Sequence, residues 1–152
     1  MRIRIRAENT GKERAPFALG LHTYLALRDD KDQLKPIDGL ELKLPGTAIG
    51  VTDEDMIPTE AIEQVQNFEG GRYDFTQRHS IGDVRFDHGF SEIYHDANGW
   101  ATTEFFDPEK KVTVVYRQDR SFGYQQVFSG EALPSKSRHR RVLAIEPMTA
   151  SA

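Results

Sequence analysis

Three side chains can donate or accept protons: His22, Asp87 and Glu146. They lie where the pattern of apolar and polar residues predicts strands or the ends of strands. Glu146 follows the apolar run 142–145 and precedes Pro147, which restricts Glu146 to an extended backbone. A carboxylate at the end of a buried strand is costly unless it is paired or solvated in a cleft. Glu146 is therefore either a strand-end side chain in bulk water or a functional carboxylate.

His22 lies in a segment, residues 15–27, in which apolar residues alternate with small or polar ones. The apolar face, which begins at Phe17, is expected to pack in the core. The His22 face of the predicted strand also holds Tyr24 and small residues, which leaves space beside both rings. A lone histidine on a strand is more often a hydrogen-bonded structural residue than a catalyst. Asp87, followed by His88 and Gly89, is by itself typical of a turn.

The composition limits the classes of function. The chain has 152 residues, with 20 Lys plus Arg against 24 Asp plus Glu, for a net charge of −4. This acidity gives no general attraction to nucleic acid or anionic lipid. The absence of cysteine excludes disulfides, thiolate nucleophiles and zinc–sulfur sites. No signal-peptide core and no membrane-length apolar run is present, so we expect a cytoplasmic protein.

Strands and turns dominate the rest of the chain. Alternation at residues 1–6 predicts a strand, whereas 29–50 is loop-like and 59–65 could form a brief helical turn. Residues 83–93 indicate strand and loop. A hairpin is predicted from 100–106 and 112–117, followed by strands at 124–129 and 142–146. Residues 1–152 are therefore expected to form one all-β domain, an antiparallel β-sandwich.

Several short motifs follow one another along nearly the whole chain. They are NTGKERAPFALGLHTYL (9–25), MIPT (56–59), YDF with IG (73–75, 81–82), FDHGF (86–90), VTV with QVFSG (112–114, 126–130) and AIEP (144–147). In this order they resemble the signature of the aldose 1-epimerase, or galactose mutarotase, family. Glu60 stands where the family's IPTG turn usually has glycine. The resemblance covers the C-terminal half of such proteins. Their first half, with a sugar-contacting arginine and a second histidine, has no counterpart in this sequence.

The resemblance implies a β-supersandwich, incomplete at its N-terminal side, whose concave face binds a monosaccharide such as an aldohexose. Glu146 matches the family's general base, His22 its general acid, and Asp87 a carboxylate that binds sugar hydroxyls. Tyr24 and Gln126 are further candidates for substrate binding. The implied activity is an isomerase that interconverts anomers without a metal, nucleotide or flavin cofactor.

Two other classes of protein remain open. A non-catalytic carbohydrate-binding domain would keep the pocket without the turnover. A metal-binding barrel of the cupin type would use His22, His79, His88 or His95. Such sites generally have two histidines at i and i+2 on one strand face, whereas position 24, two residues after His22, is Tyr. Half a sandwich would also leave an unpaired sheet edge and an open apolar face. We therefore expect a homo-oligomer or association with a missing N-terminal half.

Overall fold

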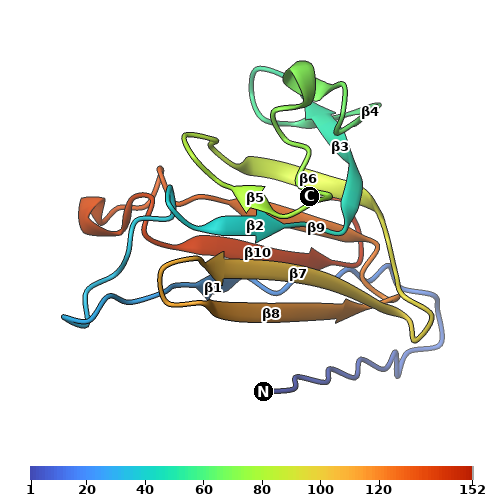
Figure 1. Cartoon of the computed structure of the whole chain (residues 1–152). Helices are drawn as coiled ribbons and strands as arrows, with labels where there is room; N and C mark the ends of the chain where they lie inside the picture. The colour runs from blue at the N-terminus through green and yellow to red at the C-terminus, as the bar shows by residue number, and fades with distance from the viewer. Residues whose placement is uncertain (152) are drawn as a thin grey trace.

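The computed structural model describes residues 1–151 as two antiparallel sheets packed on one another (Figure 1). The larger sheet has the order β1-β10-β9-β6-β3-β4, and the smaller sheet has the order β5-β2-β7-β8. The strands of the larger sheet are β1 (Thr23–Leu25), β10 (Leu143–Met148), β9 (Tyr124–Phe128), β6 (Asp87–Ile93), β3 (Gly46–Thr52) and β4 (Pro58–Gln64). Those of the smaller sheet are β5 (His79–Ser80), β2 (Glu41–Lys43), β7 (Trp100–Asp107) and β8 (Val112–Asp119). Two short 3-10 helices, η1 (Phe68–Gly71) and η2 (Lys136–Arg138), lie in the connections.

The core lies between the two sheets because alternate side chains of each strand point inward. Phe105 of β7 and Leu42 of β2 contribute from the smaller sheet, and Phe90, Val127 and Ile145 contribute from the larger one. All five are fully buried. The side chains between them on β6, β9 and β10 therefore face away from the core, and this outer face holds the candidate site.

The predicted all-β antiparallel sandwich is confirmed. The hairpin of β7 and β8 pairs from Trp100↔Asp119 to Asp107↔Val112, as the sequence indicated. The strands expected at 124–129 and 142–146 are β9 and β10, although β10 continues through Pro147 to Met148. The alternation expected in residues 15–27 holds from Leu19 onward.

Four local predictions were wrong. Residues 1–6 form no strand within the part of the chain that the structure describes, and their side chains are exposed. Alternation alone does not make a strand when no neighbouring strand accepts its hydrogen bonds. Residues 59–65 are not a helical turn but belong largely to β4, which pairs with β3. The stretch 29–50 is not only loop, because it contains β2 and most of β3. Phe17, expected in the core, is 65% exposed.

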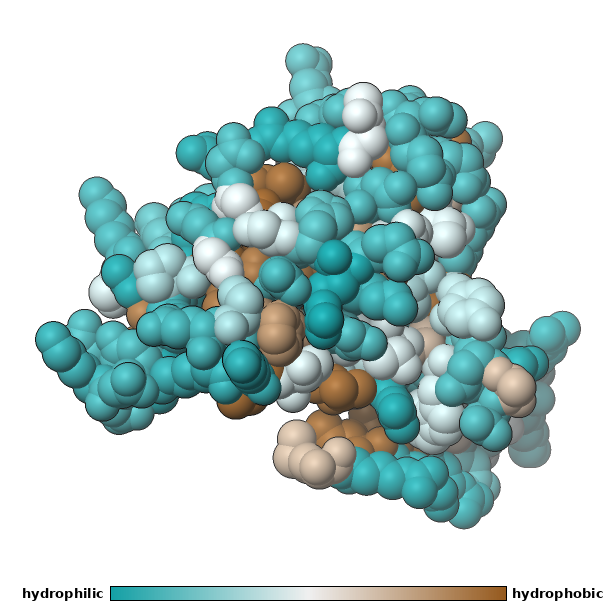
Figure 2. All heavy atoms as spheres, viewed as in Figure 1, coloured by the Kyte–Doolittle hydropathy of each residue, from teal (hydrophilic) through white to brown (hydrophobic). Residues whose placement is uncertain are grey.

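The N-terminal segment runs as coil below β8 in Figure 1 before the chain turns back into β1. Figure 2 shows that the face of the molecule in this view is largely hydrophilic. Within residues 1–151, no helix has the length and apolar content needed to cross a membrane.

Candidate active site

The register of the larger sheet sets the candidate side chains in neighbouring positions. Thr23 pairs with Ile145, and Leu21 N–H donates to the Pro147 carbonyl at 3.2 Å, so His22 lies opposite Glu146. Glu146 in turn pairs with Gln126 of β9. Asp87 of β6 pairs with Phe128, two residues along β9 from Gln126. Residues two apart on a strand share a face, so these side chains emerge on the same outer side of the sheet.

The side chains meet in one hollow of about 340 Å³. His22 Nε2 lies 3.1 Å from Glu146 Oε1, and Gln126 Nε2 donates to Asp87 Oδ1 at 3.0 Å. The side chain of His22 is 53% exposed and that of Glu146 is 14% exposed. The imidazole is thus open to a ligand, while the carboxylate lies deeper. The hollow is lined by His22, Asp87, Gln126, Phe128, Ala132, Glu146 and Met148.

Burial raises the pKa of Glu146, because desolvation disfavours its charged form. The charge of His22 opposes this shift, and the negative charge of Asp87 adds to it. A carboxylate with a raised pKa is a stronger proton acceptor once ionised, which suits general base catalysis near neutral pH. The pair therefore combines a proton acceptor and a potential proton donor at contact distance.

A match to the family model described as aldose 1-epimerase covers residues 1–150. The chain belongs to the aldose 1-epimerase family. An uncharacterized Escherichia coli (strain K12) protein, YihR, is 29% identical over 147 residues, which is 97% of this chain and 41% of that protein. The chain therefore spans about two fifths of the length of this relative.

The chain is also similar in fold to solved structures. A GalM/aldose epimerase homologue from C. elegans is 17% identical with a TM-score of 0.66, over 88% of this chain and 43% of that chain. A galactose mutarotase-like protein from Clostridium acetobutylicum is 17% identical with a TM-score of 0.63, over 90% and 38% of the respective chains. These similarities support the predicted galactose mutarotase-like sandwich.

Gly89 gives Gln126 the room to reach Asp87. The two residues are paired across β6 and β9, and a Cβ built at Gly89 would lie 3.2 Å from Gln126 Oε1. That distance is closer than an ordinary van der Waals contact. In this member of the aldose 1-epimerase family, the glycine after Asp87 and His88 therefore leaves room for the amide that donates to the Asp87 carboxylate.

Tyr24 lies beside the hollow rather than in its lining. Its ring centroid is 4.7 Å from that of His22 with the planes tilted by 36°, so Tyr24 packs against the imidazole. The structure thus connects Tyr24 with His22, while the contact with sugar that the sequence suggested stays a prediction.

His88 points to the opposite face of β6 from Asp87. Its ring lies 4.4 Å from Tyr73 and 5.7 Å from Phe68, measured between centroids, and burial lowers the pKa of His88. His88 is therefore a packing residue of this family member and not part of the hollow. Among the described side chains, no three of the histidine, aspartate or glutamate type come together as a metal site would require.

The sequence reasoning missed the walls of the hollow. Phe128 and Met148 line it because they share the outer face with Gln126 and Glu146, and strand alternation could have identified both. Ala132 comes from the loop after β9, and no pattern in the sequence indicates that this loop folds over the sheet.

Proposed function

We propose that this chain interconverts the α and β anomers of a monosaccharide, an aldohexose, by general acid and base catalysis of ring opening. The observation that carries the proposal is the 3.1 Å contact between His22 and Glu146 at the edge of a sugar-sized hollow. The hydroxyl oxygen and the ring oxygen of a cyclic aldose are attached to the same carbon, C1. An acid and a base that serve these two oxygens must therefore lie close together.

Glu146 takes the proton from the C1 hydroxyl while protonated His22 gives a proton to the ring oxygen. The bond between C1 and the ring oxygen breaks, and C1 becomes an aldehyde. The C1–C2 bond then rotates, and the ring closes on the other face of the carbonyl. In this step His22 takes back the proton from the hydroxyl that attacks, and Glu146 returns one to the C1 oxygen. No proton is gained or lost overall, so no cofactor is needed for balance.

Asp87 and Gln126 are proposed to bind the sugar. Their hydrogen bond at 3.0 Å leaves Asp87 Oδ2 and Gln126 Oε1 as acceptors for sugar hydroxyls. The ring of Phe128 adds an apolar surface in the same hollow. Polar groups that already hold each other in place lose less conformational freedom on binding than free side chains would.

We further propose that the chain corresponds to the C-terminal half of its longer relatives and that it forms a homo-oligomer or associates with an N-terminal half. The exposure of the His22 side chain beside the hollow supports the association, because an adjoining surface would cover the imidazole.

Polarimetry of a freshly dissolved α-aldose tests the activity. We expect the protein to accelerate the change in rotation, and Glu146→Gln to lose at least ~10²-fold of the acceleration, since a general base supplies ~10²–10⁴-fold. Glu63→Gln, an exposed glutamate on β4, is the matched control and should keep the native rate. Equal rates for native protein and Glu146→Gln would remove the enzyme proposal.

The open hollow also supports a second function, sugar binding without turnover. Calorimetry distinguishes it: binding of an aldose without faster mutarotation would identify a carbohydrate-binding domain.

A further inference from the structure

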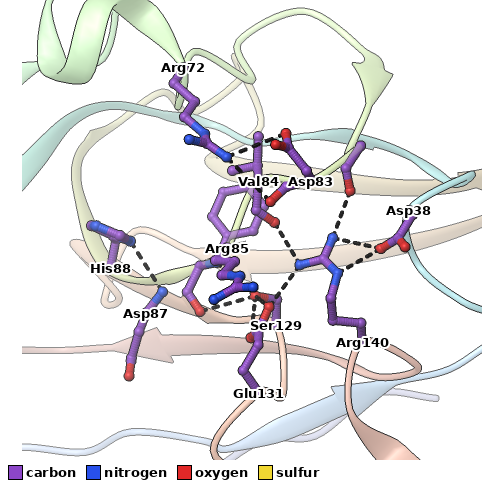
Figure 3. Close-up of polar contacts among 12 residues, drawn as sticks. Asp38, Arg72, Asp83, Val84, Arg85, Asp87, His88, Ser129, Glu131 and Arg140 are labelled. Carbon is purple, nitrogen blue, oxygen red and sulfur yellow. Dashed lines mark hydrogen bonds and ion pairs between the residues drawn. The ribbon is translucent and has the colours of Figure 1, made fainter.

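A second polar cluster, outside the hollow, is built around Arg140 (Figure 3). Its guanidinium contacts Asp38 Oδ1 through Nε at 2.7 Å and Nη2 at 2.6 Å. Nη2 also donates to the Gly82 carbonyl at 2.6 Å, and Nη1 donates to the Val84 carbonyl at 2.9 Å and to Glu131 Oε1 at 2.7 Å. A guanidinium has five N–H groups, and four of these contacts are hydrogen bonds, while the contact of Nη2 with Asp38 is an ion pair.

The cluster joins three segments that are far apart in the sequence. Asp38 lies before β2, Gly82 and Val84 lie before β6, and Glu131 follows β9. Arg140 itself has a positive φ of 51°, which is unfavourable for a residue with a side chain. Such a conformation persists where surrounding contacts hold it in place. The contacts therefore fix both the side chain and the backbone of Arg140.

From Glu131 the contacts continue to β6. The Ser129 hydroxyl lies 2.9 Å and 2.7 Å from the two carboxylate oxygens of Glu131, so it donates its proton to that carboxylate. The same hydroxyl accepts the Phe86 N–H at 2.7 Å, and Ser129 N–H donates to the Phe86 carbonyl at 2.9 Å. Phe86 directly precedes Asp87, so these bonds hold the backbone from which the Asp87 side chain projects.

We propose that Arg140 is a positioning residue for the sugar site, acting through Glu131 and Ser129 on the backbone at Phe86 and so on Asp87. The same cluster holds the loop that carries Ala132, one wall of the hollow. Arg140 does not line the hollow, so its effect is on where other groups lie. The sugar-binding part of this inference rests on the proposed function, whereas the mechanical link between Arg140 and Phe86 does not.

Two variants break the link at different points. Glu131→Ala removes the contacts with Ser129 and with Arg140 but leaves the contacts of Arg140 with Asp38, Gly82 and Val84, so these two other segments stay joined. Arg140→Lys keeps the charge, but an ammonium is a compact charge with three donors and cannot reproduce the planar set of contacts. Arg72→Gln is the matched control. Arg72 lies in the same region and pairs with Asp83 at 3.3 Å, but it is separate from the contacts of Ser129.

Amide hydrogen exchange tests the link without any sugar. We expect the Phe86 amide to exchange roughly tenfold faster in Glu131→Ala and in Arg140→Lys, since each variant weakens the series of hydrogen bonds that leads from Arg140 to Phe86. The Ile145 amide in β10 should be unchanged, and Arg72→Gln should leave both rates as in the native protein. Unchanged exchange at Phe86, or an equal increase at Phe86 and Ile145, would overturn the proposal, because the second result would mean general destabilisation.

Sugar titration tests the consequence for the site. Both variants should raise KM, or the Kd for an aldose, roughly five- to tenfold with kcat nearly unchanged, because Asp87 contributes to binding rather than to proton transfer. In an Asp87→Asn background the additional loss should disappear. Additive losses would overturn the proposal. A native protein that neither binds nor converts any aldose would refute the proposed function, while the exchange rates would still decide the role of Arg140.

Discussion

Replacing Gly89 by alanine should stabilise the fold and weaken the site at the same time. Gly89 has no positive φ and lies in β6, so alanine fits the backbone there. Gly→Ala at a compatible position stabilises by ~0.4–1 kcal/mol through the unfolded chain. In a chain of this length that corresponds to a rise in Tm of about 1–4 °C.

The new methyl group would meet the Gln126 amide, since the Cβ position lies 3.2 Å from Gln126 Oε1. The amide can move by a few tenths of an ångström at little cost in stability, because it is the end of a flexible side chain. Its hydrogen bond to Asp87 at 3.0 Å would be disturbed, however. Loss of such a bond is worth ~0.5–1.5 kcal/mol, so we expect aldose binding to weaken roughly two- to tenfold.

Gly50→Ala is the matched control. Gly50 lies on β3 beside Gly89, but a Cβ there meets only the Gly89 carbonyl oxygen, at 3.9 Å. Thermal unfolding and calorimetry with an aldose should therefore show a gain in Tm for both variants and a loss of affinity for Gly89→Ala alone. The side-chain amide signals of Gln126 in NMR spectra should shift only in Gly89→Ala. Equal affinities of the two variants would refute the reasoning.

Four variants at three positions test other properties of the structure. Glu146→Gln should raise Tm at pH 7–8, because burial raises the pKa of Glu146. The contribution of Glu146 to the stability of the native protein is fully present below about pH 4 and is lost as the pH rises through the folded pKa. Thermal melts should show the difference shrinking toward pH 4. Gln118→Met should lower the free energy of unfolding by ~1–3 kcal/mol in urea titrations, since it leaves the buried amide of Gln125, now 2.7 Å from Gln118 Oε1, without that partner. Tyr24→Phe should keep the native polarimetric rate and Tyr24→Ala should lower it, because the ring of Tyr24 and not its hydroxyl packs against His22. Equal losses of rate in the two variants would instead indicate that the hydroxyl binds sugar.

The parts of the fold that the sequence predicted are those with strong local patterns. The hairpin of β7 and β8 has clear alternation and a turn at Asp107-Pro108. β4 was misread because its glutamates, alanine and glutamine favour helix locally, and pairing with β3 overrides that preference. β3 was missed because it contains Gly46 and Gly50. Gly46 is there for packing, since a Cβ at that position would lie 2.7 Å from Phe90 Cβ.

In the candidate site, too, the sequence predicted what depends on local patterns and not what depends on the pairing of distant segments. Alternation placed His22 on the polar face of its strand, and the apolar run before Glu146 placed that residue at the end of a buried strand. Neither pattern could place the two residues opposite each other, because the pairing of β1 with β10 joins residues more than 100 positions apart. The Asp87–Gln126 bond depends on β6 and β9 being neighbours, which is a property of the sheet order. The cluster of Arg140 depends on three loops at once. Its sequence neighbourhood, SKSRHRR, indicates only a basic, polar loop.

β1 is the outermost strand of its sheet and has only three residues, so within residues 1–151 its backbone is held from one side, by β10. His22 directly precedes this strand, whereas Glu146 is fixed in the interior of the sheet. In the proposed proton transfer, the donor is therefore the partner whose position can change when the edge of the sheet frays. A polypeptide that adds a strand alongside β1 would hold the His22 imidazole against the Glu146 carboxylate. The rate of the proposed reaction would then depend on which polypeptide binds at this edge of the sheet.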